Sequence, residues 1–199
     1  MKKLTKTLLF THTVCAAVFF TTSVHAQFSG GIRAGVNLAT EQYPGYTMQN
    51  AILGYGGAFA RYQVNQIGFQ LEANYSGEGG NLKDASNGDI NKYRESYLNV
   101  PLFIQGRFPF GGYIELGAQD GFLLSSTFNY NNNGIVNIKG MYKSNNFSVG
   151  GGAGYEFQKQ GVKGLGINIR YMQGITAISS SGYGDIKTSA FSLGLSERF

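Results

Sequence analysis

The sequence predicts an all-β fold, an eight-stranded antiparallel up-and-down transmembrane β-barrel, and three observations lead to this fold class. Apolar residues alternate with polar or small ones at a period of two in segment after segment, as they do in strands. The connections between these segments are alternately long and short. Beyond residue 26, no apolar run approaches the roughly 18 residues that a membrane-spanning helix needs.

The first 26 residues are laid out like a secretory signal peptide. Three lysines within the first six residues precede an apolar stretch at residues 8–20, and Val24-His25-Ala26 resembles a signal-peptidase site. The apolar stretch is short for a membrane helix, which disfavours the alternative of an uncleaved anchor. We therefore expect residues 1–26 to be removed and residues 27–199 to form one barrel domain.

Loss of this segment would exclude several functions. It would remove the only cysteine, Cys15, and both histidines, His12 and His25, and with them disulfide, thiolate and imidazole chemistry. It would also remove three lysines, which lowers the formal charge from +5 to +2. A charge so close to zero provides no electrostatic basis for binding nucleic acid.

Eight segments carry the alternation, and residues 52–63 have the least clear phase. The expected strands are residues 28–38, 52–63, 67–76, 97–108, 113–125, 146–157, 165–171 and 191–199. The expected connections are residues 39–51, 64–66, 77–96, 109–111, 127–145, 158–163 and 177–187. An even strand count places both termini at the end with the short turns, which is the periplasmic side in outer-membrane barrels, and leaves the long loops extracellular.

The alternation alone does not say which face of the barrel is outside. The alternative is a soluble periplasmic or secreted barrel, similar to a lipocalin, with an apolar ligand inside. However, aromatic residues gather near the strand ends, as in the interfacial girdles of membrane barrels. The polar face is also rich in Gly and Ser, which make room inside a narrow barrel. Both cues favour an apolar face toward lipid.

Large charged residues of both signs lie on the polar face. Inside a narrow lumen such charges must be paired and hydrogen-bonded. Eight strands leave an interior that side chains fill, so we expect a structural ion-pair network and no conducting channel. The predicted members of this network are Arg33, Glu72, Arg107, Glu115, Glu156 and Arg170.

Several segments resemble the PorT-like outer-membrane β-barrel family of Gram-negative bacteria. The resemblance covers nearly all of residues 31–199, and its most specific part is the Tyr-Leu-x-Val-Pro-Leu stretch at residues 97–102. The segments are YLNVPLFIQGRF, GGYIELGAQDGFLL, VGGGAGYEF, RYMQGIT and SLGLSERF. The resemblance implies a small barrel in the cell outer membrane, linked to protein secretion through the family's founding member. One departure is Glu197, where family members commonly have an aromatic residue.

The last nine residues resemble the signal by which the barrel-assembly machinery recognises its substrates. Together with outer-membrane lipid, this machinery is an expected partner. Glu197 interrupts the apolar row of this strand, and we expect it on the lipid side at the membrane edge, where a carboxylate reaches headgroup water. The residues of the predicted signal are Phe191, Leu193, Leu195 and Phe199.

The residue types indicate that the protein is not an enzyme. A general base that titrates near neutral pH is most often a histidine, and the mature chain has none. Glu72, Glu115 and Glu156 formally allow a carboxylate mechanism, but we expect arginines to pair with them. The glycine-rich segment at residues 149–157 lacks the Lys-Ser/Thr of a phosphate-binding loop and is predicted to be a strand.

Asp84, Asn87 and Asp89 in one expected loop offer oxygen atoms, the ligands that Ca²⁺ prefers. Solvation of an acidic loop explains them more simply, so we predict no metal and no cofactor.

Three tyrosines in the expected long loops, Tyr43, Tyr46 and Tyr142, are predicted to contact an envelope or extracellular partner. The basis for this prediction is that aromatic residues are enriched at protein interfaces. The predicted function is therefore a non-enzymatic, structural or interaction role through the extracellular loops.

Overall fold

The computed structural model describes residues 26–42, 48–83, 90–130, 134–159, 161, 164–180 and 185–199. The predicted signal peptide lies outside the described residues except for Ala26, so its removal stays a prediction. No helix among the described residues is both long enough and apolar enough to cross a membrane.

The described part of the chain consists of antiparallel strands and one short 3₁₀ helix. In chain order these elements are β1 (Ala26–Gln42), β2 (Gln49–Val64), β3 (Ile67–Lys83), β4 (Ile90–Arg107), β5 (Gly112–Asn129), β6 (Ile135–Asn137), η1 (Lys139–Met141), β7 (Asn145–Glu156), β8 (Leu165–Gly174) and β9 (Lys187–Arg198).

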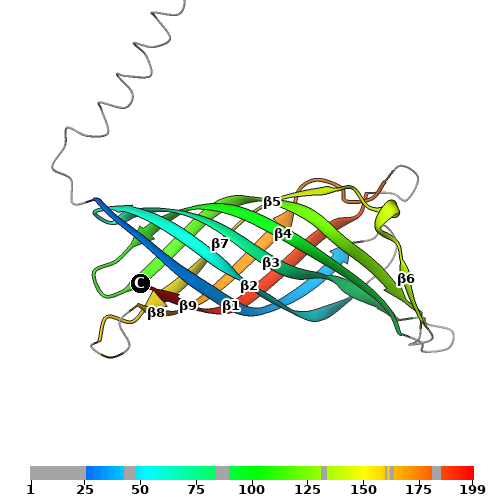
Figure 1. Cartoon of the computed structure of the whole chain (residues 1–199), viewed down its shortest axis with the longest axis horizontal. Helices are drawn as coiled ribbons and strands as arrows, with labels where there is room; N and C mark the ends of the chain where they lie inside the picture. The colour runs from blue at the N-terminus through cyan, green and yellow to red at the C-terminus, as the bar shows by residue number, and fades with distance from the viewer. Residues whose placement is uncertain are drawn as a thin grey trace, which may run out of the picture.

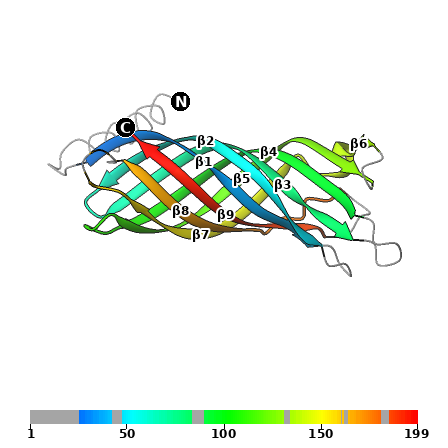
Figure 2. The ribbon, with the colours of Figure 1, turned by 90° about the horizontal axis from the view of Figure 1, so that it is seen from below.

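Eight of these strands close into a ring (Figures 1 and 2). β1 pairs with β2 on one side and with β9 on the other, and β4 pairs with β5. The short β6 pairs only with the end of β5, among the described residues, and stands outside the ring order. The predicted eight-stranded up-and-down barrel is therefore confirmed.

The two ends of the barrel differ. At one end, on the left in Figure 1, the turns at residues 65–66 and 108–111, the end of β7 and the start of β8 lie beside the C-terminus. Asn65 has φ 53° there, the left-handed conformation that a two-residue hairpin turn requires. At the other end lie β6, η1 and the ends of the longest strands. We call these the short-turn end and the long-loop end.

Several strands extend beyond their predicted ends. β3 and β4 remain paired as far as Lys83 and Ile90, so most of the loop expected at residues 77–96 is strand. The loop expected at residues 127–145 likewise contains β6 and η1. The sequence did not indicate these extensions because they carry polar residues on both faces, and the apolar–polar alternation that marks a strand is then absent.

The polarity of the barrel is that of a membrane protein. Large apolar side chains face outward, for example Leu116 with 73 % of its surface exposed, while the interior is lined by polar and charged residues. This arrangement is the reverse of a soluble lipocalin-like barrel, and that alternative is not favoured. We call the outward set the apolar belt: Ile32, Val36, Leu38, Ile67, Phe69, Leu71, Tyr75, Leu98, Leu102, Ile104, Ile114, Leu116, Phe122, Phe147, Val149, Ile167, Ile169, Tyr171, Phe191, Leu193 and Leu195.

The inward face of β7 is nearly bare, because Gly150, Gly152 and Gly154 occupy it. A Cβ atom on Gly154 would collide with the ring of Tyr113, and one on Gly152 would lie 3.2 Å from Oε1 of Glu115. The small residues of the polar face thus leave space for the large side chains of other strands, as the sequence indicated.

Candidate functional site

The centre of the barrel holds four buried charged side chains, here called the central quartet: Arg33, Glu72, Glu115 and Arg170. They come from β1, β3, β5 and β8, so their contacts cross the lumen between walls that are not neighbours. Glu72 Oε1 lies 2.6 Å from Arg33 Nη1 and 2.9 Å from Arg170 Nη2. Arg170 Nε donates to Glu115 Oε1 at 2.8 Å.

Neutral amides provide further hydrogen bonds to the quartet. Glu72 also accepts hydrogen bonds from Gln70 at 2.6 Å and from Asn74 at 2.7 Å. Gln105 donates to Glu115 at 2.9 Å, and Arg33 donates to Asn168 at 2.6 Å. Each carboxylate oxygen of the quartet therefore has a donor, which is the condition under which buried charges are tolerated.

A second group of charged side chains, here called the short-turn cluster, lies at the short-turn end of the barrel. It contains the two remaining predicted members of the network, Arg107 and Glu156. Its single carboxylate, Glu156, is contacted by three guanidinium groups: Arg61 Nη1 at 2.8 Å, Arg107 Nη2 at 2.8 Å and Arg198 Nη2 at 2.7 Å. Glu156, Arg107 and Arg198 are the last residues of β7, β4 and β9, and Arg61 lies near the end of β2.

The structure brings the six predicted residues together in two groups of unlike composition, and all six face the interior. Arg107 and Glu156 belong to the short-turn cluster and the other four form the central quartet. Sequence reasoning missed Arg61 because the phase of β2 was unclear. It missed Arg198 because the final strand was treated only as an assembly signal, although the alternation of that strand places Arg198 on the polar face.

Three glutamates, here called the carboxyl cluster, are buried on the long-loop side of the apolar belt: Glu41, Glu78 and Glu95. Glu78 and Glu95 lie directly opposite each other in the β3–β4 pair, beyond Tyr75 and Leu98 of the belt. Asn99 donates to Glu78 at 3.0 Å, and no described lysine or arginine forms an ion pair with Glu78 or Glu95.

The carboxyl cluster lies beyond the belt, and its environment favours the protonated forms of Glu78 and Glu95. Burial, with the charge of Glu41, raises the pKa of Glu78 to about 7 although Asn99 opposes the shift. Burial, then the neighbouring Glu41 and Glu78, raises the pKa of Glu95 well above its ordinary value. Arg94 on the same strand donates instead to the carbonyls of Gly80 and Tyr93. In the described part of the chain, no grouping of His, Cys, Asp and Glu is arranged to hold a metal ion.

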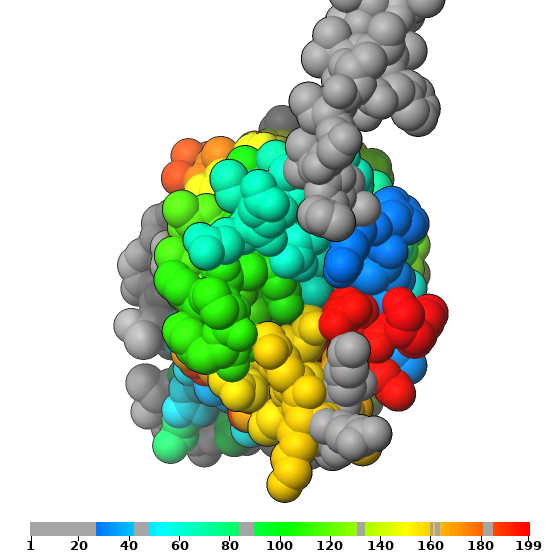
Figure 3. All heavy atoms as spheres, turned by 90° about the vertical axis from the view of Figure 1, so that its left-hand side faces the viewer, coloured from blue at the N-terminus to red at the C-terminus, as the bar shows by residue number. Residues whose placement is uncertain are grey.

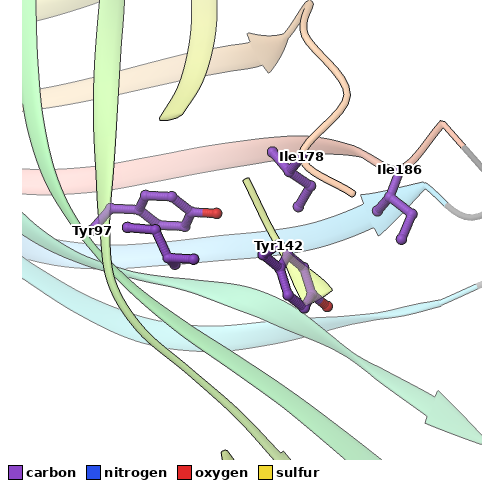
Figure 4. Packing of buried hydrophobic residues seen from close by; sticks show 5 residues of the cluster. Tyr97, Tyr142, Ile178 and Ile186 are labelled. Atoms are coloured by element: carbon purple, nitrogen blue, oxygen red, sulfur yellow. The ribbon is translucent and has the colours of Figure 1, made fainter. Parts of the chain in front are cut away.

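A buried apolar cluster, here called the apolar cap, lies near the carboxyl cluster on the long-loop side of the quartet (Figure 4). Its members are Tyr97, Leu123, Tyr142, Ile178 and Ile186. Tyr142, which the sequence suggested as a loop contact for a partner, is 8 % exposed and donates to Glu41 at 3.4 Å, so its ring belongs to the interior. Tyr43 and Tyr46 lie outside the described residues, as do the calcium candidates Asp84, Asn87 and Asp89.

The C-terminal strand β9 closes the ring, and its four predicted signal residues all face outward. They are Phe191, Leu193, Leu195 and Phe199, which are 42–78 % exposed. Glu197 is also exposed, between Ile32 of β1 and Leu165 of β8. The assembly role of this strand stays a prediction.

A closed antiparallel ring with an apolar outer surface and a filled polar interior defines a membrane β-barrel. The family model described as outer membrane protein beta-barrel domain matches residues 12–199. The chain belongs to this family of outer-membrane β-barrel proteins.

Solved structures support the fold. Neisserial surface protein A has 12 % sequence identity and a TM-score of 0.51, with 87 % of this chain and 99 % of that chain covered. Ail, the attachment invasion locus protein of Yersinia pestis, in complex with the heparin analogue sucrose octasulfate, has 16 % identity and a TM-score of 0.50 over the same coverage. A search of curated proteins finds no match. At these identities the similarity concerns the fold, and it does not extend to the PorT-like branch in particular.

We predict that Glu72→Gln strongly destabilises the barrel. The substitution leaves Arg33 and Arg170 buried without their shared counter-charge, which should lower the free energy of unfolding by about 3 kcal/mol or more. Urea unfolding in lipid or detergent measures this change. The matched control is Glu197→Gln, which neutralises an outward carboxylate and should change stability by about 0.5 kcal/mol or less. Equal effects of the two variants would contradict a structural quartet.

We predict that the long-loop end loses stability as the pH rises through about 7. Between pH 4.5, the ordinary pKa of a glutamate, and about 7, the folded protein holds a proton on Glu78 that the unfolded chain has released. The stabilisation is therefore fully present at low pH and is lost with rising pH.

Hydrogen exchange at the amides of Lys143 and Ile178 measures this effect, since both donate hydrogen bonds within the cap region, at 2.7 and 2.8 Å. Their protection, corrected for intrinsic exchange, should fall between pH 5.5 and pH 8 by roughly tenfold or more. Glu78→Gln should weaken this pH dependence. Protection that is constant with pH in the unsubstituted protein would show that the carboxyl cluster does not control the cap.

Proposed function

We propose that this protein is a closed, non-enzymatic outer-membrane barrel with a structural or interaction role at its long-loop end. The observation that carries the proposal is the filled lumen. Side chains from opposite walls meet in the central quartet, and the buried side chains of the apolar cap fill part of the interior toward the long-loop end.

The space left inside the lumen supports a closed state. A cavity of about 40 Å³ lies between the quartet and the carboxyl cluster, next to Arg33, Glu78 and Arg170. It is large enough for a few water molecules. Two buried amide oxygens at its edge, of Asn74 and Asn99, have no protein donor and would accept from such waters. This cavity is a hydration site and not a conduction path.

The buried carboxylates support a non-enzymatic role. Glu72 and Glu115 are bound by arginines and amides, and Glu156 is bound by three arginines. A carboxylate held in this way is poorly suited to transfer a proton or to attack a substrate.

The orientation in the proposal places the short-turn end in the periplasm and the long-loop end outside the cell. Short turns and the C-terminus share one end of the ring, as in bacterial outer-membrane barrels. At the other end β3, β4 and β5 rise beyond the belt, and β6 presents Ile135 and Val136 with 73 % and 58 % of their surface exposed. Exposed apolar residues above the membrane are suited to contact a partner protein.

We predict that the purified protein shows no stable conductance in planar lipid bilayers, because the quartet blocks the lumen. An open porin inserted under the same conditions provides the positive control. Steady ohmic steps from the purified chain would contradict the closed state.

We predict that a photo-crosslinking residue at Val136 captures an envelope or extracellular protein in intact cells. The same residue at Leu116, in the apolar belt, provides the control and should label lipid. A partner from a protein-secretion system would support the role that the PorT-like resemblance implies. If Val136 gave no more protein adducts than Leu116, β6 would not be an interaction surface.

A further inference from the structure

A second cavity among the described residues has no part in closing the barrel. It has a volume of about 230 Å³ and opens at the short-turn end, which faces the viewer in Figure 3. Arg107 and Arg198 line it, together with Glu156. Arg198 is the most exposed member of the short-turn cluster, with 29 % of its side chain exposed, compared with 10 % for Arg107 and 4 % for Arg61.

The charges around this cavity do not balance. The central quartet has two guanidinium groups and two carboxylates, whereas the short-turn cluster has three guanidinium groups and one carboxylate. Among the described residues that line the cavity, Glu156 is the only carboxylate. The side chains of the cluster therefore carry a net charge of +2: Arg107, Arg198 and Glu156 line the open cavity, and the buried Arg61 contacts Glu156 without lining it.

The two arginines at the cavity retain donors for a ligand. Arg107 donates through Nη1 to Gln105 at 3.0 Å and through Nη2 to Glu156 at 2.8 Å. Arg198 uses Nε and Nη2 on one oxygen of Glu156, both at 2.7 Å. A guanidinium has five N–H groups, so three on each arginine have no acceptor among the described residues. Donors in this planar arrangement match the oxygens of a phosphate or carboxylate.

The rest of the wall is uncharged and mostly polar, with Phe108 and Pro109 as its apolar members. Its amide side chains are those of Gln27, Gln63, Asn65, Gln66 and Gln158. They can donate further hydrogen bonds to an anion without adding a competing negative charge.

We propose that this cavity binds a phosphate dianion, either inorganic phosphate or the end group of a phosphate monoester. A charge of −2 neutralises the excess of the cluster, whereas a single carboxylate would leave one positive charge uncompensated. The two arginines bind the phosphoryl oxygens, and the amides bind the neutral remainder. This site is separate from the interaction surface at the long-loop end and does not depend on it.

Calorimetric titration of the purified chain with inorganic phosphate, in a neutral maltoside detergent, tests the proposal. Saturable binding is expected, and Arg198→Gln should weaken it by roughly tenfold or more, because a charge-assisted contact is lost. Arg107→Gln provides a second variant at the same site. The matched control is Arg94→Gln, which removes one guanidinium at the long-loop end and should leave the phosphate affinity unchanged.

Two further arms test the chemistry of the ligand. Lowering the pH from about 7.5 to 5 should weaken phosphate binding, since the second pKa of a phosphate group is about 6, but should not weaken the binding of sulfate, which stays a dianion. Glycerol phosphate in solution and phosphatidic acid in nanodiscs distinguish a soluble monoester from a lipid headgroup.

No saturable phosphate binding by the folded protein would overturn the proposal. Equal losses for Arg198→Gln and Arg94→Gln would also overturn it, because they would indicate a non-specific charge effect. If Arg198→Gln failed to fold, Arg107→Gln would serve in its place, and an unchanged phosphate affinity of that variant would overturn the proposal.

Discussion

The rest of the structure depends on one constraint, the need to neutralise charges inside a barrel whose apolar residues face outward. Most of the interior therefore lacks the apolar core that stabilises a soluble domain, and the central quartet, on four different strands, connects its walls. Arg170 illustrates the demand: its guanidinium contacts Glu72 and Glu115 and lies 3.8 Å from the ring centroid of Phe103. Buried charges of this kind are tolerated only when all their partners are present. The bare face of β7 follows from the same demand, since a Cβ atom on Gly152 would lie only 3.2 Å from Oε1 of Glu115.

Along the barrel axis the constraint is met in three ways. The quartet at the centre is neutral by pairing. The carboxyl cluster lies beyond the belt, where burial raises the pKa of Glu78 and favours its neutral form, and the apolar cap packs nearby. The short-turn cluster keeps an excess of positive charge, which the open cavity allows solvent or an anion to compensate. The long-loop side therefore holds buried carboxyl groups that respond to protons, and the short-turn end has an open cavity beside an excess of positive charge.

Much of this fold could be predicted from the sequence, because a strand that contributes to the apolar belt must alternate between apolar and polar residues. Residues 28–38 and 165–171 follow the predicted phase throughout. Beyond the belt both faces meet polar surroundings, so the extensions of β3 and β4 left no alternating signal. The interior positions of Arg33 and Arg170 followed from alternation, but the choice of partners depends on how strands meet across the lumen, which a single sequence does not specify. Tyr142 shows the same limit, since a loop tyrosine gives no local sign that it turns inward.

The most direct test of the central claim is a double-mutant cycle on Arg170→Met and Glu115→Gln, measured as free energies of unfolding in lipid. Residues that interact directly in a buried network couple by about 0.5–3 kcal/mol. If the barrel depends on this network, the coupling energy between Arg170 and Glu115 should lie in the upper part of that range, at about 2 kcal/mol. The double variant should then lose less stability than the sum of the losses of the two single variants. Losses that add to within about 0.5 kcal/mol would show that the pair does not hold the walls of the barrel together.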